Sequence, residues 1–488
     1  MKLAQLLSGV EIIECCCDLE IDVSDVVYDS KKVTKGCLFV CLCGFNFDAH
    51  EFASQAFENG AAAIICSKRM VVSNFVRVLD TRSALSIISV NFFGNPSEKL
   101  KMIAVTGTKG KTTVTGLINK ILNDAGRKSA SIGTFGVVMG DKIIRTKNTT
   151  PESFEIQKVL RMLLDQGFTH VVMEASSLGI KNHRLDGIFF DYAVFTNFSK
   201  DHIGKNEHSS IEEYFNSKLL LFGNSKKSFL NCDDEKFEQI AKACGKNYET
   251  FGLCPKAKIR AKNVNLVSGQ GYVGIELCVG ETKFRLPIPG VFNVYNALAA
   301  ICVCRNEGVD ESVINNSLLE AKIKGRAEIV PVCNTYTIMI DYAHNALSMK
   351  NILTELRKYD PKRLIILFGA GGERARDRRF EMGKIAGELS DFSVLTADNS
   401  RGENVNDIIR DIEIGIGPTG GNYVVIPDRY EAIKYCMRNA KEGDMIVLAG
   451  KGHEDYQEIS GIKHHFDERE IIKEISALGI HMAGVTQL

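Results

Sequence analysis

The sequence lacks any excess of charge of one sign. Lys and Arg together number 60, and so do Asp and Glu, so the formal net charge is zero. Proteins whose main partner is nucleic acid or an anionic membrane usually carry an excess of Lys and Arg. We therefore expect no nucleic-acid partner and no membrane partner. Small-molecule substrates are expected instead, with positive charge concentrated at particular sites.

Long apolar runs are also absent, and none approaches the roughly 20 residues that a helix needs to cross a bilayer. Acids interrupt the first 20 residues, which lack a small-residue cleavage site, so no secretory signal is expected. The 15 cysteines form no C-x-x-C pair, which argues against a zinc ribbon or a thioredoxin-like site. We expect a cytoplasmic protein with reduced, buried cysteines, and a monomer as the default.

The length of 488 residues predicts roughly three domains at about 150 residues each. The turn-forming sequence Phe-Gly-Asn-Pro at 93–96 marks the first boundary. We place a small α/β domain at 1–98, a central domain at 99–325 and a C-terminal domain at 326–488.

Apolar strand-like runs alternate with helical stretches through the second and third domains. Such runs include 102–106, 170–174 and 193–197 in the second domain, and 337–341, 364–369, 393–398 and 445–450 in the third. This pattern predicts parallel sheets covered by helices on both faces, with ligands at the carboxyl ends of the strands. The predicted fold class is therefore α/β, with a mostly parallel central sheet and a Rossmann-like C-terminal domain. Alternation near 255–290 predicts a small antiparallel meander.

A glycine-rich segment, Thr-Gly-Thr-Lys-Gly-Lys-Thr-Thr at 106–113, follows a predicted strand and opens a predicted helix. Backbone N–H groups of such a loop turn toward a phosphate, and Lys111 would reach the terminal phosphates. Thr112 is the natural hydroxyl ligand for Mg²⁺. No N-K-x-D motif for guanine is present, so ATP is favoured over GTP. The predicted loop residues are Gly107, Thr108, Lys109, Gly110, Lys111, Thr112 and Thr113.

The short T-G-T-x-G-K-T-T form of this loop resembles that of the Mur ligase family, and the resemblance covers nearly the whole chain. Further motifs in matching order are Asp29-Ser30, Thr149-Thr-Pro-Glu152, Met173-Glu-Ala-Ser-Ser177, Phe195-Thr-Asn-Phe-Ser-Lys-Asp-His202, Tyr214-Phe-Asn-Ser-Lys218, Gly290-x-x-Asn293, Gly325-Arg326, Asp341-Tyr-Ala-His344, Gly371-Gly-x-Arg374 and Gly450-Lys-Gly-His-Glu454.

The resemblance implies an ATP-dependent ligase that makes a C–N bond in peptidoglycan precursor synthesis. Its closest likeness is to members that add a diamino acid to UDP-N-acetylmuramoyl-L-alanyl-D-glutamate. Such an enzyme phosphorylates a carboxylate, and an amine then attacks the acyl phosphate. The chain must neutralise phosphate charge and align three reactants.

The resemblance also implies roles for particular residues around ATP. Lys111, Glu174, His202 and Lys218 would be catalytic. Mg²⁺ ligands would be Thr112, Glu174, His202 and Lys218, with Lys218 carrying a CO₂-derived carbamate. Further ATP contacts would come from Asn293, Arg326 and Asp341.

The UDP-muramyl substrate would contact Ser30, Thr149, Thr150, Ser176, Arg184 and Lys218. Two departures from the family pattern fall in this region. Lys31 replaces an arginine and cannot form its planar fork, and Leu178 replaces a histidine.

A loop at 398–401, Asp-Asn-Ser-Arg, resembles the family's Asp-Asn-Pro-Arg, which accompanies meso-diaminopimelate. Arg401 keeps the fork that suits a distal carboxylate, which lysine lacks. An ion pair between Arg401 and Glu403 is the structural alternative. The predicted amino-acid site comprises Arg374, Asp398, Asn399, Arg401, Gly450 and Glu454. Most of the charged run at 373–379 is expected to be solvated, with Arg374 the exception.

Three alternatives stay open. The ligase could add L-lysine or another diamino acid in place of meso-diaminopimelate. It could be a relative such as folylpolyglutamate synthase, although the Asp-Asn-Ser-Arg and Gly-Lys-Gly-His-Glu segments argue against that. It could also be an inactive nucleotide-binding regulatory protein, which the missing histidine at Leu178 keeps open.

Overall fold

The computed structural model describes residues 1–44, 47–200, 203–204, 207–269 and 272–478. The chain forms two compact units. The first comprises Met1–Arg260 and Leu298–Val313, and the second comprises Ala261–Ala297 and Ile314–Leu488. This grouping places the expected N-terminal and central domains in one unit, and the three-domain boundaries stay a prediction.

The N-terminal part of the first unit is built on a five-stranded sheet in the order β1-β5-β4-β3-β2. All neighbours in it are parallel except β1 and β5. Apolar clusters cover both faces, one around Leu38 and Ile88 and the other around Phe39 and Ala53. The elements are α1 (Leu3–Leu6), β1 (Ile12–Cys15), β2 (Val26–Val27), β3 (Leu38–Val40), α2 (Ala53–Glu58), β4 (Ala63–Cys66), β5 (Phe75–Val78) and α3 (Thr81–Phe93).

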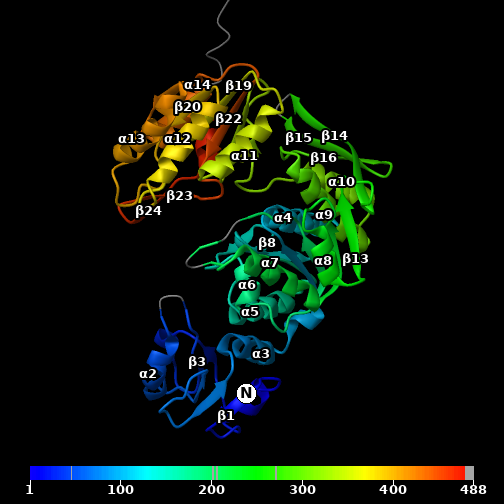
Figure 1. The fold of residues 1–488 in the computed structure, drawn as a ribbon, viewed down its shortest axis with the longest axis vertical. Coiled ribbons are helices and arrows are strands. Elements are labelled where there is room, and N and C mark those ends of the chain that lie inside the picture. Colours follow the sequence, from blue (N-terminus) through cyan, green and yellow to red (C-terminus); the bar gives the residue numbers. More distant parts are fainter. Residues whose placement is uncertain (45–46, 201–202, 205–206, 270–271, 479–488) are drawn as a thin grey trace, which may run out of the picture. The chain divides into compact units, whose positions relative to one another are not determined.

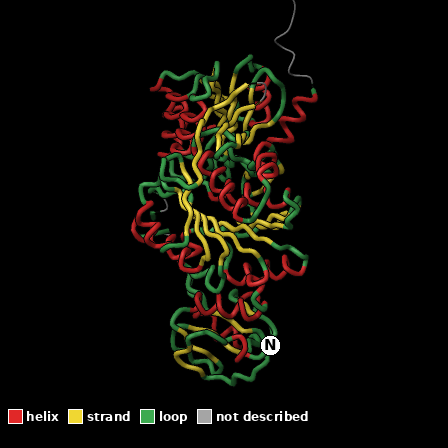
Figure 2. Tube along the Cα trace, turned by 90° about the vertical axis from the view of Figure 1, so that its right-hand side faces the viewer, coloured by secondary structure: helices red, strands yellow, loops and turns green. Residues whose placement is uncertain are grey.

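The central sheet of the first unit runs β13-β12-β11-β6-β10-β7-β8-β9. The six strands from β13 to β7 are parallel, and β8 and β9 add an antiparallel edge. Helices lie on both faces of this sheet (Figure 2). Its strands are β6 (Lys101–Thr106), β7 (Ser129–Gly133), β8 (Gly136–Met139), β9 (Lys142–Ile144), β10 (His170–Glu174), β11 (Phe190–Phe195), β12 (Ser225–Asn231) and β13 (Tyr248–Gly252). Its helices are α4 (Lys111–Asp124), α5 (Ser153–Asp165), α6 (Ser177–Lys181), α7 (Ile211–Leu219) and α8 (Phe237–Cys244).

The second unit contains the predicted meander and a six-stranded sheet in the order β17-β18-β22-β19-β20-β21, parallel except for β17 (Figure 1). The strands are β14 (Ile259–Gly269), which begins in the first unit, then β15 (Tyr272–Val279), β16 (Thr282–Leu286), β17 (Glu328–Val330), β18 (Thr337–Asp341), β19 (Arg363–Phe368), β20 (Phe392–Leu395), β21 (Tyr423–Val425), β22 (Asp444–Ala449), β23 (Tyr456–Ile459) and β24 (Ile462–His465). The helices are α9 (Phe292–Asn306) and α10 (Glu311–Leu319), which cross the unit boundaries, then α11 (Ala346–Arg357), α12 (Asp377–Leu389), α13 (Val405–Ile416), α14 (Arg429–Arg438) and α15 (Glu468–Ala477).

Two sequence expectations meet the structure differently. The predicted strands at 170–174 and 337–341 coincide with β10 and β18. The prediction that the cysteines are buried is wrong for Cys15, Cys16 and Cys43, which are exposed on the N-terminal part. Among the residues that the structure describes, no helix is long and apolar enough to span a membrane.

Candidate active site

The glycine-rich loop joins β6 to α4, as the sequence predicts. Gly107 has φ +139°, and a Cβ there would lie 2.0 Å from Thr196 Oγ1. Only glycine therefore allows the loop to approach the end of β11 this closely. The backbone from Gly107 to Thr113 runs directly into the first turn of α4, so its N–H groups sit at a helix N-terminus, where anions are favoured.

Thr196 and Asn197, just after β11, hold this loop. Thr196 Oγ1 and Asn197 Nδ2 both donate to the carbonyl of Lys109, at 2.6 and 2.9 Å. In return, Asn197 Oδ1 accepts from the N–H of Lys109 at 3.0 Å. Both residues belong to the motif at 195–202, but neither was predicted to hold the loop. Their position after the strand next to β6 is the signal that could have found them.

Two lysine side chains converge on the loop from inside the unit. Lys111 Nζ donates to the carbonyls of Gly107 and Thr108, both at 3.0 Å. Lys218 Nζ, from α7, donates to the same Gly107 carbonyl at 2.9 Å and lies 4.4 Å from the centre of the Tyr214 ring. Lys218 is only 1 % exposed. The two amino groups therefore concentrate positive charge where the loop would hold phosphates.

Oxygen atoms gather beside this point around the buried carboxylate of Glu174, at the end of β10. Glu174 Oε2 accepts from Thr112 Oγ1 at 3.0 Å and from Thr134 Oγ1 at 3.3 Å. A Cβ on Gly133 would lie 2.3 Å from Glu174 Oε1, so the carboxylate uses the space that this glycine leaves. Mg²⁺ is a hard ion that prefers oxygen ligands, so Thr112 and Glu174 fit it. His202 lies outside the described residues.

The segment predicted to contact the muramyl substrate adjoins Glu174. Thr150 Oγ1 donates to the backbone carbonyl of Glu174 at 2.8 Å and accepts from the N–H of Ser176 at 3.0 Å. Arg184 Nη1 donates to the Thr150 carbonyl at 2.9 Å, and Arg184 Nη2 pairs with Glu152 at 2.7 Å. The structure therefore brings three of the predicted substrate residues together beside the oxygen cluster.

Two other predicted substrate residues, Thr149 and Ser30, make fewer contacts with this group. Thr149 Oγ1 lies 3.5 Å from Thr134 Oγ1, which adds it to the oxygen cluster. Ser30 begins a single 3-10 turn, Ser30–Lys32. No hydrogen bond among the described residues links Ser30 to this cluster.

A histidine that sequence reasoning did not assign lies near the departure at Leu178. His208 is fully buried, and its Nε2 lies 2.9 Å from Ser177 Oγ at the start of α6. Its ring packs against Tyr214, with ring centres 5.2 Å apart. An imidazole therefore does contact the Ser-Ser segment, although it comes from a different part of the chain.

The remaining predicted ATP residues lie in the second unit. Asn293 is buried, and its Nδ2 donates to the Pro289 carbonyl at 2.7 Å. Arg326 lies over the Tyr342 ring, 5.2 Å from its centre. Burial raises the pKa of the Asp341 carboxyl, which accepts from two backbone N–H groups. Their role toward ATP stays a prediction.

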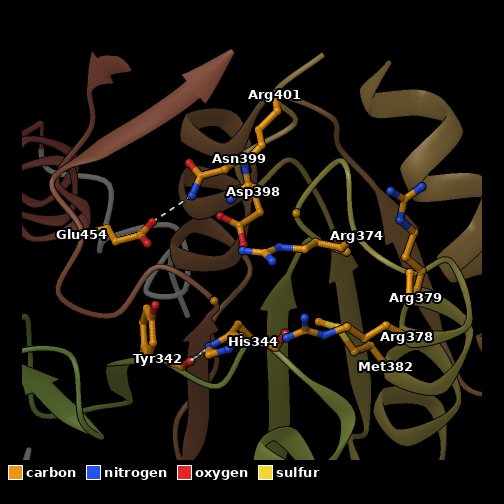
Figure 3. Close-up of a pocket in the computed structure, with 14 residues that line it drawn as sticks. Tyr342, His344, Arg374, Arg378, Arg379, Met382, Asp398, Asn399, Arg401 and Glu454 are labelled. Atoms are coloured by element: carbon orange, nitrogen blue, oxygen red, sulfur yellow. Dashed lines mark hydrogen bonds between the residues drawn. The ribbon is translucent and has the colours of Figure 1, made fainter. Parts of the chain in front are cut away.

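A cavity of about 280 Å³ opens at the carboxyl ends of the strands in the second unit (Figure 3). All six residues predicted for the amino-acid site line it, and its wall also includes residues that the sequence analysis did not assign. The lining residues are Tyr342, His344, Ala370, Gly371, Arg374, Ala375, Arg378, Arg379, Met382, Asp398, Asn399, Arg401, Gly450 and Glu454.

Carboxylates and an amide form one part of this cavity wall. Asn399 Nδ2 donates to Glu454 Oε2 at 2.9 Å (Figure 3). The fully buried Lys451 donates to Asn399 Oδ1 at 2.8 Å and lies 3.3 Å from Asp398 Oδ1. Burial raises the pKa of the Glu454 carboxyl. The sequence analysis did not assign Lys451, although it belongs to the quoted Gly-Lys-Gly-His-Glu motif.

Arginines form another part of the wall. Arg374 points toward Asp398, and Arg378 toward His344 (Figure 3). Arg378 donates to the His344 carbonyl at 3.0 Å, and burial together with Arg374 lowers the pKa of its guanidinium. Arg379 is 2 % exposed. Most of this run is exposed, as expected. The exceptions are the partly buried Arg378 and the buried Arg379 of α12, whereas Arg374 is itself exposed, so the expectation that Arg374 is the exception is wrong.

Arg401 lies at the rim with a left-handed backbone, at φ +50°. Its Nη1 donates to the Gly372 carbonyl at 2.6 Å, and its Nε lies 3.4 Å from Glu458 Oε2. The alternative pairing of Arg401 with Glu403 is wrong, because Glu403 pairs with Arg379 at 2.8 Å.

Behind the cavity, a buried arginine joins two of the strand ends that form it. Arg429 Nη1 donates to the Ala397 carbonyl at 3.0 Å, and Nη2 donates to the Ala449 carbonyl at 2.9 Å. Its charge is balanced by Glu468, which accepts from Nε at 2.9 Å. Asp398 and Gly450 directly follow the two anchored carbonyls. Arg429 therefore fixes their spacing, a role that nothing in its local sequence indicated.

Comparisons with known proteins agree with this geometry. Three family models match successive parts of the chain: the Mur ligase family catalytic domain at 22–89, the Mur ligase middle domain at 105–304, and the Mur ligase glutamate ligase domain at 325–452. The chain belongs to the Mur ligase family. The predicted family is confirmed, and with it an ATP-dependent ligase that uses Mg²⁺ and small-molecule substrates.

Two curated relatives of this Mur ligase are named as UDP-N-acetylmuramoyl-L-alanyl-D-glutamate–2,6-diaminopimelate ligases. The one from Clostridium acetobutylicum is 40% identical over 483 residues, which cover 97% of this chain and 99% of the relative. The one from Caldanaerobacter subterraneus is 40% identical over 482 residues, which cover 98% and 99%.

A solved structure with the same enzyme name superposes with a TM-score of 0.73 at 28% identity, covering 99% of this chain and 100% of that one. The predicted α/β fold class is thereby confirmed.

Proposed function

We propose that this Mur ligase adds meso-diaminopimelate to the D-glutamate carboxylate of UDP-N-acetylmuramoyl-L-alanyl-D-glutamate. ATP would first convert that carboxylate to an acyl phosphate, which the amine of the amino acid then attacks. The names of the curated relatives support this assignment. The observation that carries it is the cavity of the second unit, where arginines and carboxylates occur together.

The cavity chemistry favours an amino acid with charges of both signs at its distal end. Arg374 and Arg401 offer planar donor pairs that suit carboxylates. Glu454 and Asp398 offer carboxylates that suit an ammonium group. L-lysine has a distal ammonium but no distal carboxylate, so it would use the carboxylates of the cavity but not its arginines. L-lysine is therefore the second candidate.

In the first unit, the roles follow from the atoms around the glycine-rich loop. The loop N–H groups and Lys111 would bind the phosphates of ATP. Thr112 and Glu174 would hold Mg²⁺, which neutralises phosphate charge when bound. Arg184, beside Thr150, would bind the acidic end of the muramyl peptide.

Lys218 is proposed to carry a carbamate derived from CO₂. The buried amino group lies close to Lys111 and to the loop, where a second unmodified cation would repel Mg²⁺. A carbamate would instead supply an anionic oxygen. His202 is proposed as a further metal ligand. A monomer working in the cytoplasm completes the proposal.

The test removes the distal carboxylate contact. Arg401→Ala should lower kcat/KM for meso-diaminopimelate by about a hundredfold or more, because a charge-assisted pair is lost. Activity with L-lysine, measured by phosphate release and by product mass, should change little.

Arg410→Ala is the matched control, because Arg410 is an exposed arginine of α13 that pairs with Asp407. Unchanged turnover of meso-diaminopimelate by Arg401→Ala would refute the amino-acid assignment. ATP binding without turnover in the presence of all substrates would instead support an inactive regulatory protein.

A further inference from the structure

Two cysteine thiols meet in the first unit, away from the residues assigned above. Cys232 follows β12 and Cys254 follows β13, and their Sγ atoms lie 3.0 Å apart. Both side chains are partly exposed. A disulfide bond is about 2.05 Å long, so each sulfur would need to move by only about 0.5 Å to form one.

The backbone, rather than the thiols, holds the two loops together. The N–H of Cys232 donates to the Phe251 carbonyl at 3.0 Å. The Asp233 carboxylate accepts from the N–H groups of Leu253 and Cys254, at 2.6 and 3.1 Å. The pair is therefore pre-positioned even when both thiols are reduced.

Gly252 makes the close approach of the sulfurs possible. A Cβ at this position would lie 2.9 Å from Cys232 Sγ and 2.8 Å from Asp233 Oδ2. Any side chain there would push the Cys232 thiol or the Asp233 carboxylate aside. The geometry around the pair thus depends on the Cys232 thiol, the Asp233 carboxylate and Gly252 together.

Other neighbouring cysteines are arranged differently. Cys15 and Cys17 are two residues apart in sequence, with Sγ atoms 3.7 Å apart. Cys302 and Cys304 are fully buried in α9. A bond between Cys232 and Cys254 would instead close a loop across 22 positions, which restricts the unfolded chain.

Asn231 and Asp234, on either side of Cys232, hold the segment after β11, which in turn contacts the glycine-rich loop. Asn231 Nδ2 donates to the Thr196 carbonyl at 3.0 Å. Asp234 Oδ2 accepts from the N–H of Phe198 at 2.6 Å. The side chain of Thr196 also donates to the carbonyl of Lys109 in the loop. A covalent link at Cys232 would therefore restrain a segment that is one contact away from the phosphate site.

We propose that Cys232 and Cys254 form a site of reversible disulfide formation that stabilises the first unit and adjusts ATP binding. A low-molecular-weight disulfide supplies the oxidising equivalents. One protein thiolate attacks it, which forms a mixed disulfide and releases one small thiol. The second protein thiolate then displaces the other small thiol. The protein loses two protons and two electrons, one S–S bond forms, and the small disulfide is reduced to two thiols.

The test equilibrates the full-length protein with mixtures of reduced and oxidised glutathione, followed by alkylation and trypsin digestion. Cys232 and Cys254 fall in separate peptides, residues 228–236 and 247–256, with one cysteine each. We expect these peptides to become cross-linked in oxidising mixtures and to separate again in dithiothreitol. Cys254→Ser should abolish the cross-link. Cys244→Ser, a cysteine of α8 in the same unit, should keep it.

Oxidation should raise the melting temperature by several degrees in the wild type and in Cys244→Ser, but not in Cys254→Ser. It should also change the KM for ATP at least about twofold while leaving the KM for the amino acid unchanged. The kinetic part rests on the proposed function, whereas the cross-link does not, so the two can fail separately.

Three results would overturn the inference. Glutathione adducts on both cysteines without a cross-link would show that the thiols do not exchange with each other. Tightly bound zinc that blocks alkylation of the pair would identify a metal site instead. An oxidised enzyme with an unchanged KM for ATP would remove the link to the glycine-rich loop.

Discussion

The glycine-rich loop of the first unit and the cavity of the second unit are built on different principles. The loop is made from backbone, because glycine at position 107 lets it lie against the end of β11, and carbonyl contacts then fix it. The cavity is made from side chains that gather at the ends of several strands and are anchored from behind by Arg429. Truncating a side chain of this loop should lower activity but leave the stability of the protein unchanged. Truncating a side chain that supports the cavity should lower both stability and affinity for the amino acid.

The sharpest test of how the glycine-rich loop is built is Lys111→Ala. Removing the phosphate-binding amine should lower kcat for phosphate release by about a thousandfold, because transition-state charge loses its partner. The melting temperature should stay within about two degrees, since the contacts of Thr196 and Asn197 remain. Lys120→Ala, on the outer side of the same helix α4, is the control. A large loss of stability in Lys111→Ala would show that the loop depends on this side chain and not only on its backbone contacts.

The corresponding test of the cavity is Arg429→Ala. It would leave the Glu468 carboxylate buried without its cation, and such losses cost about 3–5 kcal/mol. Urea denaturation should show this loss, and the KM for the amino acid should rise while the KM for ATP stays unchanged. Arg438→Ala, at the other end of α14, serves as the control. Full stability of Arg429→Ala would show that the strand ends do not depend on this anchor.

A smaller effect is expected at Gly133, which leaves room for the side chain of Glu174. Gly133→Ala places a Cβ only 2.3 Å from Glu174 Oε1, so the carboxylate must shift and its contact with Thr112 is disturbed. Phosphate release should fall about tenfold, and the Mg²⁺ concentration needed for half-maximal rate should rise. Gly223→Ala, which meets no neighbouring atom within 4 Å, should leave both values unchanged.

The smallest predicted effect concerns the pH dependence of the cavity. Burial raises the pKa of Glu454 above its ordinary value. Only the ionised carboxylate attracts an ammonium group, so amino-acid binding should be strong above this raised pKa and weaken as the pH falls through it. The KM for the diamino acid, measured from pH 8 downward, should rise at a higher pH than an ordinary glutamate would give. Glu454→Gln should remove this dependence, and a profile unchanged by the substitution would contradict the role.

The structure places much of the candidate site where the sequence suggested. The glycine-rich loop and Glu174 come together because they lie at the carboxyl ends of the neighbouring parallel strands β6 and β10. Helix α7 adds Lys218 to them. The partners of charged residues were less predictable. Arg401 pairs with Glu458 rather than with Glu403, because the β23–β24 hairpin brings Glu458 alongside it.

The sequence by itself determined the family, the fold class and the residues of the glycine-rich loop, because these depend on short spacings along the chain. Only the tertiary structure decided that Arg378 and Arg379 turn away from solvent, that Arg429 links two strand ends, and that Cys232 meets Cys254. Each of these facts depends on contacts between segments far apart in sequence. Periodicity and motif spacing carry information about neighbours along the chain, whereas packing decides which distant side chains become partners.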